Sequence, residues 1–117
     1  MKMAIQLRKI YQSLNAEMLR DEVRDLLKKH GINVIEVESQ TYALPSGATQ
    51  SRITLALKAQ TKQDKDPREC GSVHIMTAPG NEVKMLLDVD EDPILREKIS
   101  VFQSDLEFIL GSYEVKW

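Results

Sequence analysis

The sequence predicts a single α+β domain over residues 1–117, with a four-stranded antiparallel sheet packed on one face by an N-terminal and a C-terminal helix. Three observations support this order, α-β-β-β-β-α. Residues 4–30 contain no Gly or Pro, which is typical of a helical segment. Apolar and polar residues alternate in Arg52–Gln60 and in Glu82–Val89, as in strands with one buried face. Apolar residues between Asp92 and Tyr113 recur at helical spacing.

The C-terminal segment carries both start and face signals of a helix. Asp92 is a good N-cap, and Pro93 is tolerated in a first helical turn. A stripe with steps of four and three residues is predicted to face the sheet, and it consists of Leu95, Ile99, Phe102, Leu106, Ile109 and Tyr113.

A second apolar line on the same helix needs its own explanation. Ile94, Val101 and Phe108 recur every seven residues, about 130° around the helix from the main stripe. Leaving that line in water would create a patch that monomers usually avoid. Trp117 is a large aromatic side chain at the last residue, which we expect to be docked on another surface. These four residues are the predicted protein interface.

The N-terminal segment is ambiguous. Its apolar positions change phase near Ser13–Asn15, so one straight helix could not bury them all. Residues 4–14 are a helix, a strand or a swapped arm, and Asn15 can cap the helix that follows. That second helix is predicted to end with Gly31 at its C′ position.

The middle of the chain is predicted to form the sheet. The expected strands are Ile32–Leu44, Arg52–Gln60, Gly71–Thr77 and Glu82–Val89, and the last two form a hairpin. A charged loop at residues 61–69 is predicted to be mobile because it has no apolar anchor.

Charge and cysteine content limit the function classes. The formal net charge is -2 and the pI is about 5.7, which disfavours nucleic-acid or anionic-membrane binding. Cys70 is the only cysteine, so the chain has no internal disulfide, and a reducing cytoplasm is the expected location. The N-terminus reaches charged residues too early for a signal peptide, and no stretch has the roughly 20 apolar residues that span a bilayer.

The strongest catalytic or ligand-binding hypothesis concerns the last hairpin. Ser72, His74 and Lys84 are expected on its open face and could form a site. A pair of Cys70 as nucleophile and His74 as base is disfavoured, because positions four apart on a strand are about 13 Å apart. A plain polar sheet face is the favoured interpretation of these residues, and no cofactor is predicted.

The sequence Asp88-x-Asp90-x-Asp92 resembles the start of a calcium-binding loop. The pattern fails, because the sixth position is Pro93 and the twelfth is Ile99, where Gly and Glu are required. Carboxylates at a helix N-terminus explain the same residues through the helix dipole. No metal site is predicted.

These observations favour a small acidic, non-catalytic protein-binding module: an adaptor, chaperone-like or inhibitor protein. In element order and charge it is similar to secretion chaperones and small phage or bacterial inhibitor proteins, with no shared motif. The second apolar line is covered either by a homodimer partner, which is favoured, or by Leu7–Met18 of the same chain. The alternatives are an enzyme or ligand binder at Ser72, His74 and Lys84, and a structural component of a larger assembly.

Overall fold

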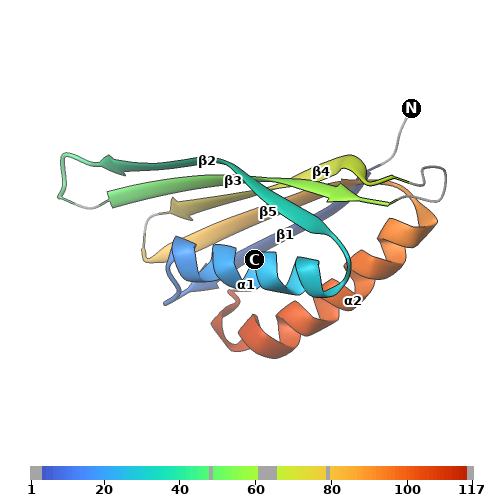
Figure 1. The fold of residues 1–117 in the computed structure, drawn as a ribbon. Coiled ribbons are helices and arrows are strands. Elements are labelled where there is room, and N and C mark those ends of the chain that lie inside the picture. Colours follow the sequence, from blue (N-terminus) through green and yellow to red (C-terminus); the bar gives the residue numbers. More distant parts are fainter. Residues whose placement is uncertain (1–3, 48, 61–65, 79, 116–117) are drawn as a thin grey trace.

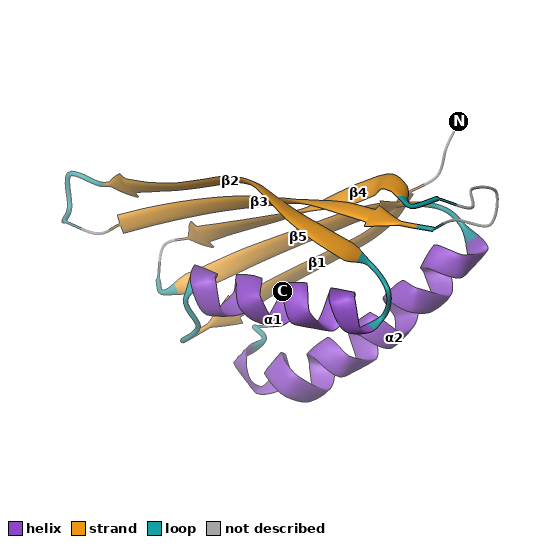
Figure 2. Cartoon of the chain, in the orientation of Figure 1, coloured by secondary structure: helices purple, strands orange, loops and turns teal. Residues whose placement is uncertain are grey.

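The computed structural model describes residues 4–47, 49–60, 66–78 and 80–115. Its elements, in chain order, are β1 (Ala4–Gln12), α1 (Ala16–Lys29), β2 (Asn33–Ala43), β3 (Thr49–Ala59), β4 (Arg68–Ala78), β5 (Glu82–Asp90), α2 (Pro93–Leu110) and the 3-10 turn η1 (Gly111–Tyr113). Figure 1 and Figure 2 show one sheet with both helices on the same face.

The sheet has five strands, so the prediction of four was wrong. The strand order is β1-β5-β4-β3-β2, and every neighbouring pair is antiparallel. The element order is therefore β-α-β-β-β-β-α, and α1 lies between β1 and β2 instead of opening the chain. This correction also removes the similarity of element order to secretion chaperones and inhibitor proteins. The α+β class and the helix-covered antiparallel sheet are confirmed.

The N-terminal segment forms an edge strand for a physical reason. In β1, Ile5, Leu7 and Tyr11 lie opposite Val89, Leu87 and Val83 of β5, on the helix-covered face. The segment becomes a strand because it pairs with β5, since a strand forms its backbone hydrogen bonds with a partner that is distant in the sequence. The helical spacing of Leu7, Ile10 and Tyr11 competes with that alternation within the segment.

The predicted break before α1 is confirmed. Ser13 has a left-handed φ of 64°, and the side chain of Asn15 accepts a hydrogen bond from the backbone N–H of Met18 at 2.7 Å. At the other end Gly31 has φ 81°, and Ile32 N–H donates to the carbonyl oxygen of Leu27 at 2.9 Å. This closing pattern is the one expected for a glycine at C′.

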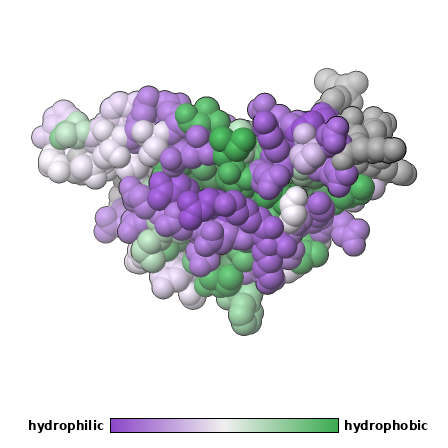
Figure 3. Space-filling view, viewed as in Figure 1, coloured by the Kyte–Doolittle hydropathy of each residue, from purple (hydrophilic) through white to green (hydrophobic). Residues whose placement is uncertain are grey.

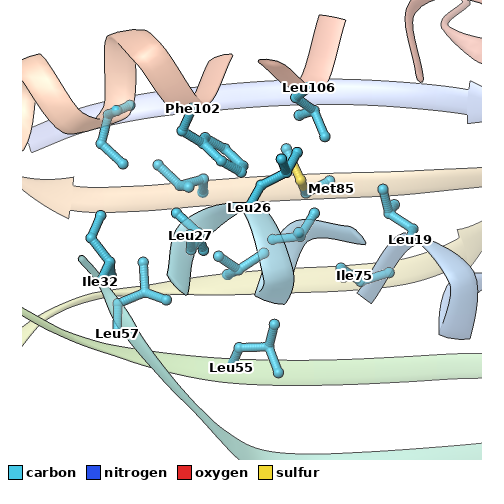
Figure 4. Close-up of a cluster of buried hydrophobic side chains, with 14 of the residues drawn as sticks. Leu19, Leu26, Leu27, Ile32, Leu55, Leu57, Ile75, Met85, Phe102 and Leu106 are labelled. Atoms are coloured by element: carbon cyan, nitrogen blue, oxygen red, sulfur yellow. The ribbon is translucent and has the colours of Figure 1, made fainter. Parts of the chain in front are cut away.

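The hydrophobic core lies between the sheet and the two helices (Figure 4). Leu19, Leu26 and Leu27 of α1 meet Phe102 and Leu106 of α2 over the inner face of the sheet. The strand residues predicted to face inward are all buried, namely Ile53, Leu55, Leu57, Val83, Met85 and Leu87. Strict alternation of apolar residues was therefore a sound guide in β3 and β5.

The two edge strands of the sheet, β1 and β2, are covered differently. The chain after α2 returns to β1, where Val115 N–H donates to the carbonyl oxygen of Ile10 at 2.8 Å and Lys9 pairs with Glu114 at 2.9 Å. Tyr11 is buried beneath this segment; burial, with Glu114 nearby, raises its pKa. At the opposite edge, β2 pairs with β3 alone among the described strands.

The β2–β3 hairpin extends past the end of β4 (Figure 1). Pairing of β3 with β4 begins at Arg52 and Met76, so Thr49 and Gln50 pair only with β2. Of the predicted mobile loop, residues 61–65 lie outside the described residues, and Arg68 and Glu69 belong to β4. Because its end extends beyond β4, the β2–β3 hairpin projects over the space beside the start of α1 (Figure 1).

Candidate functional site

The second apolar line of α2 faces outward. Ile94 is 37% exposed, Val101 is 44% exposed and Phe108 is 91% exposed. Figure 3 shows a hydrophilic band over α1 and, below it over α2, hydrophobic patches among hydrophilic residues. The structure therefore brings three of the four predicted interface residues onto one helix surface. Trp117 lies outside the described residues.

The end of α2 departs from the predicted buried stripe. Ile109 and Tyr113 were expected to face the sheet, but they are 41% and 40% exposed. Leu110 is buried in their place, at 4% exposure. The buried stripe continues from Leu106 to Leu110, a step of four residues, and α2 ends there. Tyr113 is therefore not on the helix but on the 3-10 turn that follows it. Ile109 and Tyr113 thus add apolar surface beside the second line.

The hypothesis that Leu7–Met18 covers the second line within one chain was wrong. The first part of that segment is held in β1 by pairing with β5, and its last residues begin α1. Ile94, Val101 and Phe108 remain exposed in the presence of the whole segment. A second copy of the chain therefore remains as the expected cover for this line.

Ser72 and His74 do meet on the open face of the sheet. The hydroxyl oxygen of Ser72 lies 3.4 Å from Nε2 of His74, and that of Thr54 lies 3.3 Å from Nδ1. Lys84 lies opposite Met76, which is two residues after His74 and therefore on the same face of β4. Because Nδ1 of His74 contacts a hydroxyl, no carboxylate orients the ring as in a catalytic triad. The contacts fit a polar sheet face better than an activated serine.

Cys70 and His74 do not form a nucleophile–base pair, because Cys70 is buried in the core whereas His74 contacts Ser72 and Thr54 on the open face of the sheet. Cys70 is only 1% exposed, and it is the extra residue of a bulge where Leu57 lies opposite Gly71 and Lys58 lies opposite Glu69. Burial raises the pKa of the Cys70 thiol, and the nearby carboxylate of Asp90 raises it further. A buried thiol with a raised pKa is a poor nucleophile.

The three aspartates before α2 each have a structural partner. Asp88 accepts a hydrogen bond from Gln6 at 3.2 Å, and Asp90 pairs with Arg68 at 3.6 Å. Asp92 is the N-cap of α2 and accepts hydrogen bonds from the backbone N–H groups of Ile94 and Leu95. The N-cap prediction for Asp92 is confirmed, whereas Asp88 and Asp90 belong to β5 and not to the helix start.

A groove of about 920 Å³ was missed by the sequence analysis. It lies where three connections meet, under the projecting end of the β2–β3 hairpin. Its lining comes from the β1–α1 connection and α1 (Ser13, Leu14, Asn15, Met18), from the β2–β3 hairpin (Leu44, Ser46, Thr49, Gln50), and from the end of β4, the β4–β5 turn and the start of β5 (Thr77, Ala78, Gly80, Asn81, Glu82, Val83). Turn residues signalled each connection in the sequence, but nothing local indicated that the three connections would meet.

Within the described part of the chain, no group of three or more His, Cys, Asp or Glu side chains is placed to hold a metal ion. No helix among these residues is long and apolar enough to cross a membrane. Comparisons of the chain with protein-family models, with curated proteins and with solved structures found no match. A functional assignment must therefore rest on the surfaces described above.

Proposed function

We propose that this protein is a small, acidic, non-catalytic binding module of the adaptor, chaperone-like or inhibitor kind, and that it acts as a homodimer through α2. The observation that carries the proposal is the 91% exposure of Phe108 on a well-formed helix. Aromatic residues are enriched at protein interfaces and are costly on free surfaces. Burying Phe108 would contribute about 1.5–3 kcal/mol, and Ile94 and Val101, which are already more than half buried, would each add less.

The spacing of the three side chains suits a two-fold pair of antiparallel α2 helices. If the axis passes beside Val101, this residue meets its symmetry mate and Ile94 meets Phe108 of the second copy. The two copies then use one self-complementary surface, as a closed dimer requires. Glu97 would lie opposite Asp105, whose charge is already offset by Lys29 at 3.5 Å and by a hydrogen bond from His30.

The direct test is the double variant Val101→Glu and Phe108→Glu, studied by light scattering and circular dichroism. We expect a dimeric wild-type protein and a folded monomeric variant, because a buried unpaired carboxylate is strongly unfavourable. Thermal unfolding of the wild type should also depend on protein concentration.

Val37→Glu is the matched control, because Val37 is also an exposed apolar residue, at 64%, but lies on β2. This variant should remain a dimer. A wild-type protein that scatters as a 13.3 kDa monomer at high concentration would contradict the homodimer. Loss of the dimer in Val37→Glu, with the α2 variant unaffected, would place the interface at the edge of β2 instead.

A further inference from the structure

We propose that the groove beneath the β2–β3 hairpin binds an extended peptide segment of a partner protein, one that carries aliphatic side chains and is neutral or basic. The site lies on a different surface from the α2 line, so it does not depend on the homodimer. Three elements distant in sequence build it: the start of α1, the hairpin end and the β4–β5 turn. Its volume of about 920 Å³ falls within the range of about 300–1,000 Å³ that is typical of ligand sites.

The apolar part of the groove can receive aliphatic side chains. Leu14 and Val83 belong to the buried core and also line the groove, with exposures of 7% and 2%. Met18 and Leu44 line it from α1 and from the hairpin, and they are 55% and 39% exposed. Solvent-exposed Met and Leu beside a buried apolar lining are typical of surfaces that accept varied side chains.

The polar part of the groove matches the backbone of an extended chain. Among the described residues, the side chains of Ser46, Thr49, Gln50 and Asn81 do not hydrogen-bond with other side chains or with the backbone. The four residues supply hydroxyl and amide groups that both donate and accept hydrogen bonds. Peptide N–H and C=O groups need such partners when they leave water.

Charge selects among peptides. Among the described residues that line the groove, Glu82 alone is charged, and the net charge of the chain is -2. An acidic segment would be repelled by the carboxylate of Glu82, whereas a Lys or Arg side chain would pair with it. Phosphate-bearing ligands are disfavoured for the same reason.

Two walls of the groove are held together before any ligand binds. Ser13 and Asn81 both have left-handed φ angles, of 64° and 60°. The backbone N–H of Ser13 donates to the carbonyl oxygen of Asn81 at 3.4 Å, which joins the β1–α1 connection to the β4–β5 turn. Preformed walls lower the ordering cost of binding.

The test uses a phage-displayed library of random dodecapeptides selected on the immobilised wild-type protein. We expect enriched peptides to alternate aliphatic and small polar residues and to carry Lys or Arg but not Asp or Glu. A selected peptide is then labelled, and its affinity is measured by fluorescence anisotropy. Met18→Ser with Leu44→Ser should weaken binding at least tenfold, because both apolar contacts are lost. Glu82→Lys should weaken binding of a basic peptide by a similar factor.

Val37→Ser is the matched control, because it removes an exposed apolar side chain of β2 that does not line the groove. Its affinity for the peptide should equal that of the wild type. Circular dichroism checks that each variant is folded, and amide chemical-shift changes in the wild type locate the bound peptide without any substitution. No enrichment over the bare support, an acidic consensus, or shift changes confined to α2 or β2 would overturn the proposal.

Discussion

Asp105 on α2 accepts a hydrogen bond from Nε2 of His30, the residue that follows α1, over a distance of 2.8 Å. The same carboxylate oxygen lies 3.5 Å from Nζ of Lys29. The hydrogen bond from His30, assisted by the charge of Lys29, lowers the pKa of Asp105 below its ordinary value of 3.8. A partly exposed polar contact thus connects the C-terminal end of α1 to the middle of α2.

This contact predicts a pH-dependent contribution to stability. A carboxyl group whose pKa is lowered on folding stabilises the protein above its unfolded pKa, and the contribution is lost as pH falls through the folded pKa. Asp105→Asn should therefore lower the unfolding free energy at about pH 7, and the difference from wild type should shrink below about pH 4. Urea unfolding followed by circular dichroism measures both. Asp25→Asn, at an exposed pair with Arg24, is the control. A difference for Asp105→Asn that does not change with pH would contradict the assignment.

Gly71 is predicted to tolerate no side chain. A Cβ atom at this position would lie 2.2 Å from the carbonyl oxygen of Asp88 and 2.9 Å from Cα of Val89, so β4 and β5 would have to separate. We expect Gly71→Ala to lower the unfolding free energy by at least about 1–3 kcal/mol, the usual cost of overpacking. Gly111→Ala is the matched control, because its nearest contact is Glu107 Cγ at 3.6 Å and its φ is -58°. Equal unfolding free energies for the two variants would show that β4 and β5 lie further apart at Gly71 than these distances indicate.

The end of α2 offers a paired test of burial. Leu110→Ala should lower the unfolding free energy by about 2–5 kcal/mol, since it empties a buried position. Ile109→Ala should cost less than about 1 kcal/mol in a monomer, because its side chain is 41% exposed. Denaturant melts of the two variants decide the matter. The opposite ranking would restore the stripe that sequence spacing predicted.

Cys70 is predicted to be unreactive in the folded protein. Its thiol is buried, and its raised pKa leaves little of the nucleophilic thiolate. The thiol reagent DTNB should react slowly with the native protein and rapidly after denaturation. Ser46→Cys, at the exposed hairpin end, should react at once and serves as the positive control. Rapid reaction of native Cys70 would mean that the β4 bulge opens readily.

Local signals were reliable wherever a short stretch determined the structure. The caps Asn15 and Asp92 and the glycine Gly31 depend on neighbours only a few residues away, and all three were predicted. The inward residues of β3 and β5 followed from alternation alone. The failures came where two patterns competed or where contacts were distant, as for Ala4–Gln12, which is a strand only because β5 offers it an edge.

The sequence by itself determined the α+β class, the antiparallel strands and the existence of a second apolar line on α2, because each follows from a periodicity of two or of about 3.6 residues. Tertiary structure alone decided the fifth strand, the exposure of Ile109, the close approach at Gly71 and the groove beneath the hairpin. Each of these depends on which segments far apart in the chain lie side by side. Such pairing is set by the summed burial and hydrogen bonding of the whole domain, which no single stretch encodes.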